Sequence, residues 1–425
     1  MKKLKILVFP CGSEIGLEIN RSLKYSTHIE LFGANSVDDH GRFVFDNYIE
    51  GVPFIDDEEV IPFLARLVVE HKIDAIYPAM DKVICNLKLN ENALGCKVIA
   101  SEAATNEICV SKRKTYQKLN DVIKVPKTYN SIQEVNTYPV FIKPDVGYGS
   151  RGVTKTNNQS ELNYFFHSRS IKDYVITEFL PGAEYTVDCF TDRFGNLRFA
   201  GPRIRGRISN GISVYTKPVN DDLAEFETFA IKINKTLKLN GAWFFQVKGS
   251  KDGSLVLLEV ASRLGGSSGL FRGLGVNFAL LSIFDAFGYD VEILPNDQVI
   301  EMDRALDNKY KLKINYSTVY VDFDDCLIIN NKVNLQLVGF LYSCLNEGKR
   351  IILITKHECD LKESLKTYRL NDLFDEIIYL SKTENKTDFI SNIDSIFIDD
   401  SFQERLNVKK ILNIPVFSPD MVEAL

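Results

Sequence analysis

The sequence predicts an α/β protein with a doubly wound parallel sheet toward each end of the chain. Short apolar runs alternate with helical stretches in both regions, which is the pattern of βα units. Hydrophobic residues make up 45% and charged residues 25% of the composition, as in ordinary globular domains. The length of 425 residues predicts about two to four domains.

The first predicted domain spans residues 1–107. Expected strands at 5–9, 29–33, 73–77 and 97–100 alternate with helical stretches such as 15–23. We expect a strand rather than a signal peptide at the basic N-terminus, because polar residues from Gly12 to Glu14 end the apolar run too early. Ligands bind outside the carboxyl ends of parallel strands, so residues 10–16 and Asp81 are weak substrate-site candidates. Simple loop roles are at least as well supported.

The second predicted domain spans residues 108–300, and the third spans residues 316–425. In the second we expect helices at 111–119 and 278–287, strands at 139–143, 174–179 and 186–191, and a strand pair within 242–260. Residues 297–316 are polar and form the expected linker. The third domain starts with a strand at 318–321. Further strands at 350–354 and 395–398 and a helix at 335–347 predict the second doubly wound sheet.

Charge, hydropathy and cysteine spacing exclude several classes of partner. The formal net charge of −6 provides no basic field for nucleic acid or an anionic membrane surface. No apolar run approaches the ~18–20 residues of a membrane span. The scattered cysteines argue against a disulfide framework or structural zinc. We therefore predict a cytoplasmic protein that binds neither nucleic acid nor a membrane, and leave open whether it forms a homodimer.

A glycine-rich loop follows the strand expected at 139–143. Lys143 ends that strand, and glycines stand at positions 147, 149 and 152. Glycine lets backbone N–H groups approach phosphate oxygens, and a neighbouring lysine supplies a positive charge. Such a loop is more often an ordinary hairpin, so the pattern by itself is ambiguous.

A hairpin around Asp252-Gly253 gives a more specific prediction. Asp-Gly favours a two-residue type I′ turn, which places Gln246 directly opposite Glu259 on one face. Two oxygen-bearing side chains at that separation can bind Mg²⁺ together with water and nucleotide phosphates. Lys248 shares the face of Gln246. From register alone, an exposed polar stripe is an equally supported alternative.

Together these motifs resemble the ATP-grasp superfamily over about residues 1–300, in the branch of carbamoyl phosphate synthetase and the carboxylate–amine ligases. The resemblance implies a pre-ATP-grasp Rossmann-like domain, an α+β ATP-grasp domain and the cofactors ATP and Mg²⁺. It makes Gln246 and Glu259 metal ligands, and Arg263 the catalytic arginine at the transferring phosphoryl group. It also implies a set of nucleotide contacts: Lys112, Lys143, Gly147, Gly149, Ser150, Glu178, Leu180, Glu184 and Lys248.

One position departs from the family pattern. The family usually has Glu-x-Asn, with Asn as a third metal ligand, and this chain has Ala261, which cannot coordinate a metal. Two activities therefore stay open: a ligase that joins a carboxylate to an amine or similar nucleophile through an acyl phosphate, or a non-catalytic nucleotide sensor that regulates or caps the C-terminal domain. Arg203 and Arg205 share one strand face and are expected to clamp phosphate or carboxylate. A solvated basic stripe is the alternative.

The C-terminal region places polar residues after apolar strands. Asp322 and Asp324 lie on one side of the strand end that follows 318–321, where one carboxylate can attack phosphorus while the other moves a proton. Thr355 and Asp399 each follow a later strand, and Lys386 precedes the last of these strands. In this order the residues resemble the haloacid dehalogenase (HAD) phosphatase family.

That resemblance implies a HAD-like domain without an inserted cap. It makes Asp322 the nucleophile, Asp324 the acid/base, Thr355 the phosphate-binding hydroxyl and Lys386 the charge-balancing lysine, with Asp322, Asp324 and Asp399 as Mg²⁺ ligands. Asp400 is a further metal-orienting acid, and Lys356 and Lys382 are alternatives to Lys386. The leading hypothesis is an ATP- and Mg²⁺-dependent ligase for a small carboxylate and an amine, fused to a phosphatase that acts on a phosphorylated metabolite, in a small biosynthetic pathway.

Overall fold

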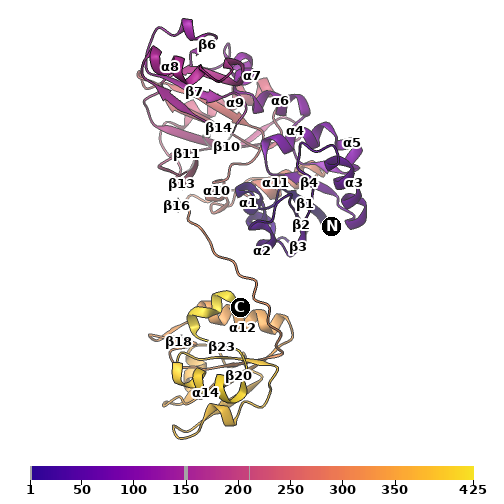
Figure 1. Ribbon diagram of the computed structural model, residues 1–425, viewed down its shortest axis with the longest axis vertical. Coiled ribbons are helices and arrows are strands. Elements are labelled where there is room, and N and C mark those ends of the chain that lie inside the picture. The colour runs from indigo at the N-terminus through magenta and orange to yellow at the C-terminus, as the bar shows by residue number, and fades with distance from the viewer. Residues whose placement is uncertain (1, 148–151, 210) are drawn as a thin grey trace. The chain divides into compact units, whose positions relative to one another are not determined.

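The computed structural model (Figure 1) describes residues 2–147, 152–209 and 211–425. The chain divides into two compact units, residues 1–306 and 307–425. The first unit includes both domains that we expected before residue 300, and the border between those two remains a prediction. None of the helices in the described part of the chain has the length and apolar character that a membrane crossing needs.

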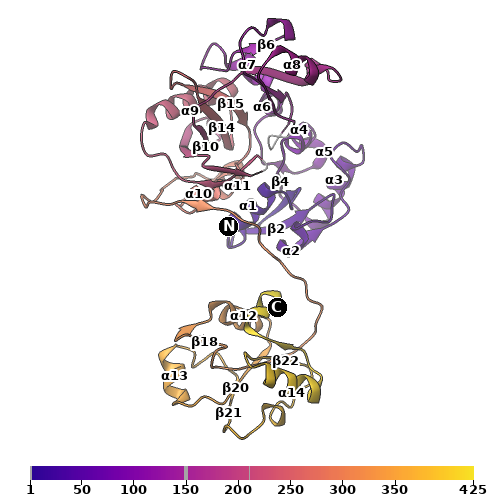
Figure 2. The same ribbon diagram turned by 60° about the vertical axis from the view of Figure 1, so that its left-hand side comes forward.

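The N-terminal part of the first unit is built on a parallel five-stranded sheet with the order β3-β2-β1-β4-β5. Its strands are β1 (Leu4–Phe9), β2 (Ile29–Ala34), β3 (Asn47–Ile49), β4 (Ala75–Pro78) and β5 (Lys97–Val98). Helices α1 (Glu14–Leu23) and α11 (Phe278–Ala286) pack on one face of the sheet, and α3 (Val60–His71) and α4 (Asp81–Leu89) pack on the other (Figure 2). Short helices α2 (Gly41–Val44), α5 (Glu91–Leu94) and α6 (Ala103–Val110) complete this part. The predicted βα succession is confirmed.

Two antiparallel four-stranded sheets form most of the remainder of the first unit. The order β6-β9-β7-β8 belongs to β6 (Thr128–Tyr129), β7 (Val140–Pro144), β8 (Thr154–Thr156) and β9 (Tyr174–Glu178). The order β11-β10-β14-β15 belongs to β10 (Glu184–Thr191), β11 (Leu197–Ile204), β14 (Gly241–Gly249) and β15 (Leu255–Ala261). The helices of this part are α7 (Lys112–Leu119), α8 (Gln159–Phe166), α9 (Leu223–Leu237) and α10 (Gly269–Arg272).

Strand β14 has one face in the core and one face free for a site. Trp243, Phe245 and Val247 pack with residues of α7 and α9. Because side chains alternate along a strand, Gln246 and Lys248 point to the opposite face. Both of these side chains are only partly buried.

Part of the expected linker at 297–316 is instead a strand, so that prediction was wrong in this segment. β16 (Met302–Asp303) pairs with β13 (Ile212–Thr216), which also pairs with β12 (Arg207–Ser209). Arg304 then bonds to Glu14 of α1. A polar composition hid this pairing, because a two-residue edge strand has no apolar run to reveal it.

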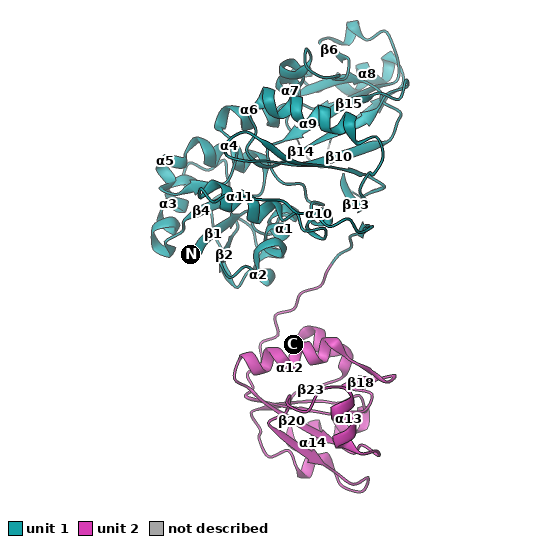
Figure 3. Cartoon of the chain, turned by 180° about the vertical axis from the view of Figure 1, so that it is seen from behind, with its two compact units in different colours: residues 1–306 teal, residues 307–425 magenta. Residues whose placement is uncertain are grey.

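The second unit has a parallel five-stranded sheet with the order β21-β20-β17-β22-β23 (Figure 3). Its strands are β17 (Thr318–Val321), β20 (Arg350–Thr355), β21 (Glu376–Tyr379), β22 (Ser395–Ile398) and β23 (Val416–Phe417), and its α-helices are α12 (Leu335–Asn346), α13 (Leu361–Thr367) and α14 (Phe402–Leu412). A small hairpin of β18 (Ile328–Ile329) and β19 (Lys332–Val333) lies between β17 and α12. Short 3-10 helices across the chain are η1 (Ile132–Glu134), η2 (Ile171–Asp173), η3 (Lys386–Asp388) and η4 (Pro419–Ala424).

Candidate functional sites

A cavity of about 220 Å³ lies between the two antiparallel sheets of the first unit. Strands β7 and β9 line one side, and strands β10, β14 and β15 line the other. The lining includes these predicted nucleotide and metal residues: Lys112, Lys143, Gly147, Glu178, Leu180, Glu184, Arg205, Gln246, Lys248 and Glu259. Gly149 and Ser150 lie outside the described residues, and Arg203 and Arg263 do not line this cavity.

The predicted opposition of Gln246 and Glu259 is confirmed, although the predicted turn is not. The two residues pair directly across β14 and β15. The turn contains residues 250–254 rather than two residues, and of Asp252 and Gly253 only Gly253 has the positive φ that a type I′ turn needs at both positions. A register shift next to Gln246 offsets the longer turn, because Val247 faces Leu257 instead of the expected partner.

Lys143 places a buried positive charge in this cavity. Only 7% of the residue is exposed, and the described ion pairs of the chain do not include it. Burial lowers the pKa of Lys143 to about 8; the charge of Lys112 lowers it too, while the carboxylate of Glu259 opposes the shift. A buried cation without an ion-pair partner favours an anion beside it.

Lys112 stands at the start of α7, next to the glycine loop. Its Nζ donates to the Gly147 carbonyl at 3.2 Å, and its backbone N–H donates to the Asp145 carbonyl at 3.1 Å. The Asp145 carboxylate accepts hydrogen bonds from Ser111 and from the backbone of Arg113. These bonds attach the helix to the segment after β7, so Lys112 and Lys143 face the same cavity from neighbouring elements.

Glu184 joins two of the predicted cationic side chains. Its carboxylate oxygens lie 2.8 Å from Nε of Arg205 and 3.3 Å from Nζ of Lys248. At the edge of the same cavity, the Glu178 carboxylate accepts the backbone N–H of Lys127 at 2.9 Å. The charged groups at this end are therefore mutually paired, unlike Lys143.

Arg203 lies away from the cavity that Arg205 lines. Only 2% of Arg203 is exposed, and its Nε contacts the Asp188 carboxylate at 2.5 Å. Gly265 packs over this ion pair, and a Cβ at that glycine would lie 2.8 Å from Oδ1 of Asp188. Strand alternation predicts a shared face but not this partner on the next strand, and the clamp formed by Arg203 and Arg205 stays a prediction. Arg207 pairs with Asp303 at the surface.

Arg263 meets Asp81 from the N-terminal part of the unit. Nε and Nη2 of the arginine lie 2.7 and 2.9 Å from the two carboxylate oxygens. The guanidinium also lies 5.3 Å from the ring centre of Phe244. Arg263 lines a separate cavity of about 680 Å³. Sequence reasoning proposed both residues but not their contact, because 182 positions separate them.

In the second unit, a buried lysine lies between two buried carboxylates. Nζ of Lys386 is 2.9 Å from Asp322 and 2.6 Å from Asp399. Asp322 follows β17, and Asp399 follows the adjacent parallel strand β22. Both side chains therefore lie at the same edge of the sheet, where the carboxyl ends of these strands meet. Burial raises the pKa of both carboxyls, while Lys386 opposes the shift.

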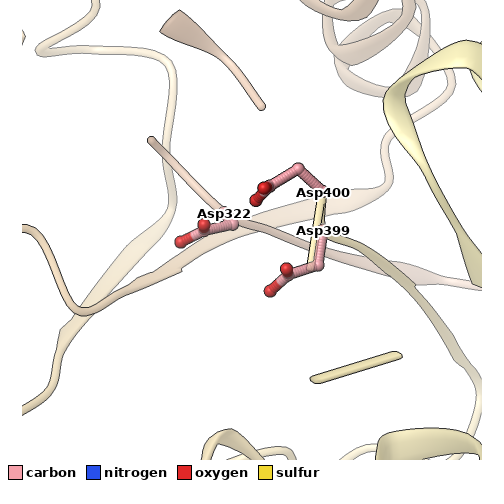
Figure 4. A group of neighbouring side chains, drawn as sticks. All are labelled: Asp322, Asp399 and Asp400. Atoms are coloured by element: carbon pink, nitrogen blue, oxygen red, sulfur yellow. The ribbon is translucent and has the colours of Figure 1, made fainter. Parts of the chain in front are cut away.

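Asp400 completes a group of three acids with Asp322 and Asp399. One carboxylate oxygen from each lies within 4.8 Å of the others, and the three point to the same side (Figure 4). The Asp324 carboxylate, which we had expected in this group, turns instead toward His357, with both oxygens 2.9 Å from Nδ1. The chain has left strand β17 at this point, so alternation no longer fixes the direction of the Asp324 side chain.

Three further residues clarify the second site. Thr355 ends β20 and is fully buried, and its hydroxyl opposes the rise in the pKa of Asp322. The alternative lysines lie in other ion pairs, Lys356 with Glu404 at 2.7 Å and Lys382 with Glu358 at 2.5 Å. Lys386 is thus the lysine that reaches both carboxylates. Sequence reasoning missed His357, whose only signal was its place just after the strand end at Thr355.

Comparison with known proteins relates the first unit to ATP-grasp proteins. Residues 170–310 match the family described as "ATP-grasp in the biosynthetic pathway with Ter operon". A D-alanine–D-alanine ligase of Fusobacterium nucleatum is 33% identical over 95 residues, which cover 22% of this chain and 32% of the ligase. The chain therefore spans about a third of the length of this curated relative.

Solved structures share the fold of the first unit at low identity. The biotin carboxylase domain of 2-oxoglutarate carboxylase from Hydrogenobacter thermophilus, in complex with MgADP, ADP and bicarbonate, has a TM-score of 0.59 at 16% identity and covers 70% of this chain and 72% of its own. N5-carboxyaminoimidazole synthetase from Staphylococcus aureus has a TM-score of 0.56 at 18% identity, covering 68% and 80%. L-amino acid ligase from Bacillus licheniformis has a TM-score of 0.55 at 17% identity, covering 69% and 78%. Residues 170–310 thus match an ATP-grasp family model, and the chain shares its fold with these solved structures.

Proposed function

We propose that the first unit is an ATP- and Mg²⁺-dependent ligase that joins a small carboxylate to an amine or similar nucleophile through an acyl phosphate, in a biosynthetic pathway. The observation that carries this proposal is the cavity in which the buried, unpaired Lys143 lies beside the opposed Gln246 and Glu259. The similarity to a D-alanine–D-alanine ligase and to an L-amino acid ligase supports the reaction class.

The side chains of the cavity fit a nucleotide triphosphate. Gln246 and Glu259 offer two oxygen ligands that would hold Mg²⁺, and the ion would supply positive charge to offset that of the phosphates. In this proposal Lys143 and Lys112 bind the phosphates, and the strand that ends at Glu178, with Leu180, borders the adenine. Fixed positive charge in a buried cavity stabilises the charge that develops during phosphoryl transfer without solvent reorganisation. Gly149 and Ser150 keep their proposed contacts to the phosphates, and Glu184 keeps its proposed contact to the ribose.

ADP formation from Mg·ATP tests the ligase proposal. We would use the Asp322→Asn protein, which lacks the expected background phosphatase, with and without a small-molecule extract of the source cells. Extract-dependent ADP that disappears in Asp322→Asn/Lys143→Ala is the expected result. Extract-dependent ADP at the same rate in that double variant would refute the site.

The alternative of a nucleotide sensor has one specific observation in its favour, the alanine at position 261 opposite Phe244. A sensor binds ATP, which raises the melting temperature, yet forms no ADP with any substrate fraction. Turnover with a purified fraction would exclude it.

We further propose that the second unit is a phosphatase of the HAD type acting on a phosphorylated metabolite. The carrying observation is Lys386, buried between Asp322 and Asp399, with Asp400 alongside. These three carboxylates would hold Mg²⁺, and Asp322 would attack phosphorus. Asp322→Asn should abolish hydrolysis of small aryl phosphates, while the surface variant Asp372→Asn should retain it. Hydrolysis by Asp322→Asn at the normal rate would refute the nucleophile.

A further inference from the structure

His357 is fixed on several sides beside the second site. Its Nδ1 lies 2.9 Å from both oxygens of Asp324, and its Nε2 lies 2.9 Å from Oγ of Ser364 in α13. The ring packs edge-on against Phe323, with centres 5.0 Å apart, and the His357 carbonyl accepts the hydroxyl of Tyr379 at 2.6 Å. The imidazole side chain is 11% exposed, whereas that of Asp324 is 52% exposed.

The two ring nitrogens have different roles. Whenever Asp324 is ionised, its carboxylate only accepts hydrogen bonds, so Nδ1 then donates to it. Nε2 lies within hydrogen-bond distance of the Ser364 hydroxyl, which can donate or accept. The largely buried ring therefore attaches a half-exposed carboxyl group to helix α13.

We propose that His357 is a positioning residue for Asp324 and holds its carboxyl group toward the leaving-group oxygen of a phosphate monoester. This inference rests on the proposed phosphatase function. As an Asp322 oxygen forms a bond to phosphorus, the bond from phosphorus to the leaving oxygen breaks, and that oxygen takes the proton of the Asp324 carboxyl. Asp324 regains a proton from the water that later hydrolyses the aspartyl phosphate, and Asp322 is released as a carboxylate.

Leaving groups of different basicity provide the test, because only a basic alkoxide needs the proton. We would compare β-glycerophosphate with p-nitrophenyl phosphate. Misplacing a general acid by about an ångström can cost about 100-fold in rate. His357→Ala should therefore lower kcat for β-glycerophosphate about 100-fold with KM little changed, and lower kcat for p-nitrophenyl phosphate only a few-fold.

Two conservative variants separate positioning from packing. In His357→Asn, the amide nitrogen takes the place of Nδ1 and can donate to Asp324, whereas in His357→Gln it takes the place of Nε2 and reaches Ser364 instead. We expect Asn to restore most of the β-glycerophosphate rate and Gln to behave like Ala. Equal losses on both substrates, or equal rescue by Asn and Gln, would overturn the inference. If the normal protein hydrolyses neither substrate, the phosphatase proposal itself fails, which is a distinguishable result.

Discussion

Raising the pH above 8 should weaken ATP binding through a single side chain, Lys143. Burial and the neighbouring Lys112 hold the pKa of Lys143 at about 8, well below that of a free lysine. Phosphate oxygens favour the protonated amine, so a nucleotide binds together with a proton whenever Lys143 has lost its own. Because binding takes up this proton, affinity must fall as the pH rises through the pKa of the free protein.

The magnitude follows from the protonated fraction. At pH 7 about nine-tenths of Lys143 is protonated, and the lost affinity is only about 0.1 kcal/mol. At pH 9 about a tenth is protonated, which costs about 1.4 kcal/mol, or about tenfold in Kd. Glu259 raises the pKa of Lys143. Glu259→Gln should therefore shift the midpoint of the pH profile below 8.

Isothermal titration calorimetry with Mg·ATP between pH 7 and pH 9 measures this effect. Buffers with different ionisation enthalpies report the proton uptake directly. Lys143→Arg keeps a charge across the whole range and should give a flat profile, whereas Lys143→Met should bind weakly at every pH. A tenfold loss in Lys143→Arg that equals the loss in the normal protein would refute the reasoning, because the titrating group would then lie elsewhere.

The other predictions concern the arginine, the metal face and the second unit. Asp81→Asn removes the charge that holds Arg263, so ADP formation should fall about tenfold or more. The Kd for ATP, measured by calorimetry, should stay within about twofold. Equal losses in ADP formation and in ATP affinity would contradict a role of Arg263 at the transferring phosphoryl group. Ala261→Asn adds an amide to the metal face and should lower the Mg²⁺ concentration for half-maximal ATP binding, and an unchanged Mg²⁺ dependence in the folded variant would place residue 261 away from the metal. Lys386→Met leaves two buried carboxylates without their cation and should cost about 3–5 kcal/mol of unfolding free energy in urea. The matched surface change Lys382→Met should cost about 0.5 kcal/mol or less, and similar losses for the two lysines would show that the buried contacts add nothing.

The parts of the first site that local pattern controls could be predicted from the sequence. Strand alternation placed Gln246 and Lys248 on one face, because the period of two holds wherever a strand is regular. The opposition of Gln246 and Glu259 was right although the turn was wrong, because the register shift beside Gln246 offset a longer turn. A sequence contains no local signal for such a shift.

The contacts between distant segments could not be predicted. The ion pair between Arg203 and Asp188, on the neighbouring strand, had no signal in the sequence. His357 and Asp324 are 33 positions apart, and both lie beyond regular strands, where alternation no longer fixes direction. In both cases the identity of the residue suggested chemistry, but the tertiary neighbour decided what the side chain does.

Asp81 bears directly on whether the first unit is a ligase or a sensor. Its carboxylate engages Nε and Nη2 of Arg263, while Nη1 makes only a long contact of 3.4 Å with the Leu264 carbonyl. The ring of Phe244 lies against the guanidinium. Ala261 pairs directly with Phe244 across β14 and β15, and directly opposed Cβ atoms are about 4.5–5.5 Å apart. A side chain longer than alanine at position 261 would therefore reach the same ring. Asp81 and Phe244 therefore fix the plane of the arginine and leave Nη1 available for an oxygen of the reacting group. A ligase would use an arginine oriented in this way, so we propose that the alanine leaves room for Arg263 rather than marking a lost activity.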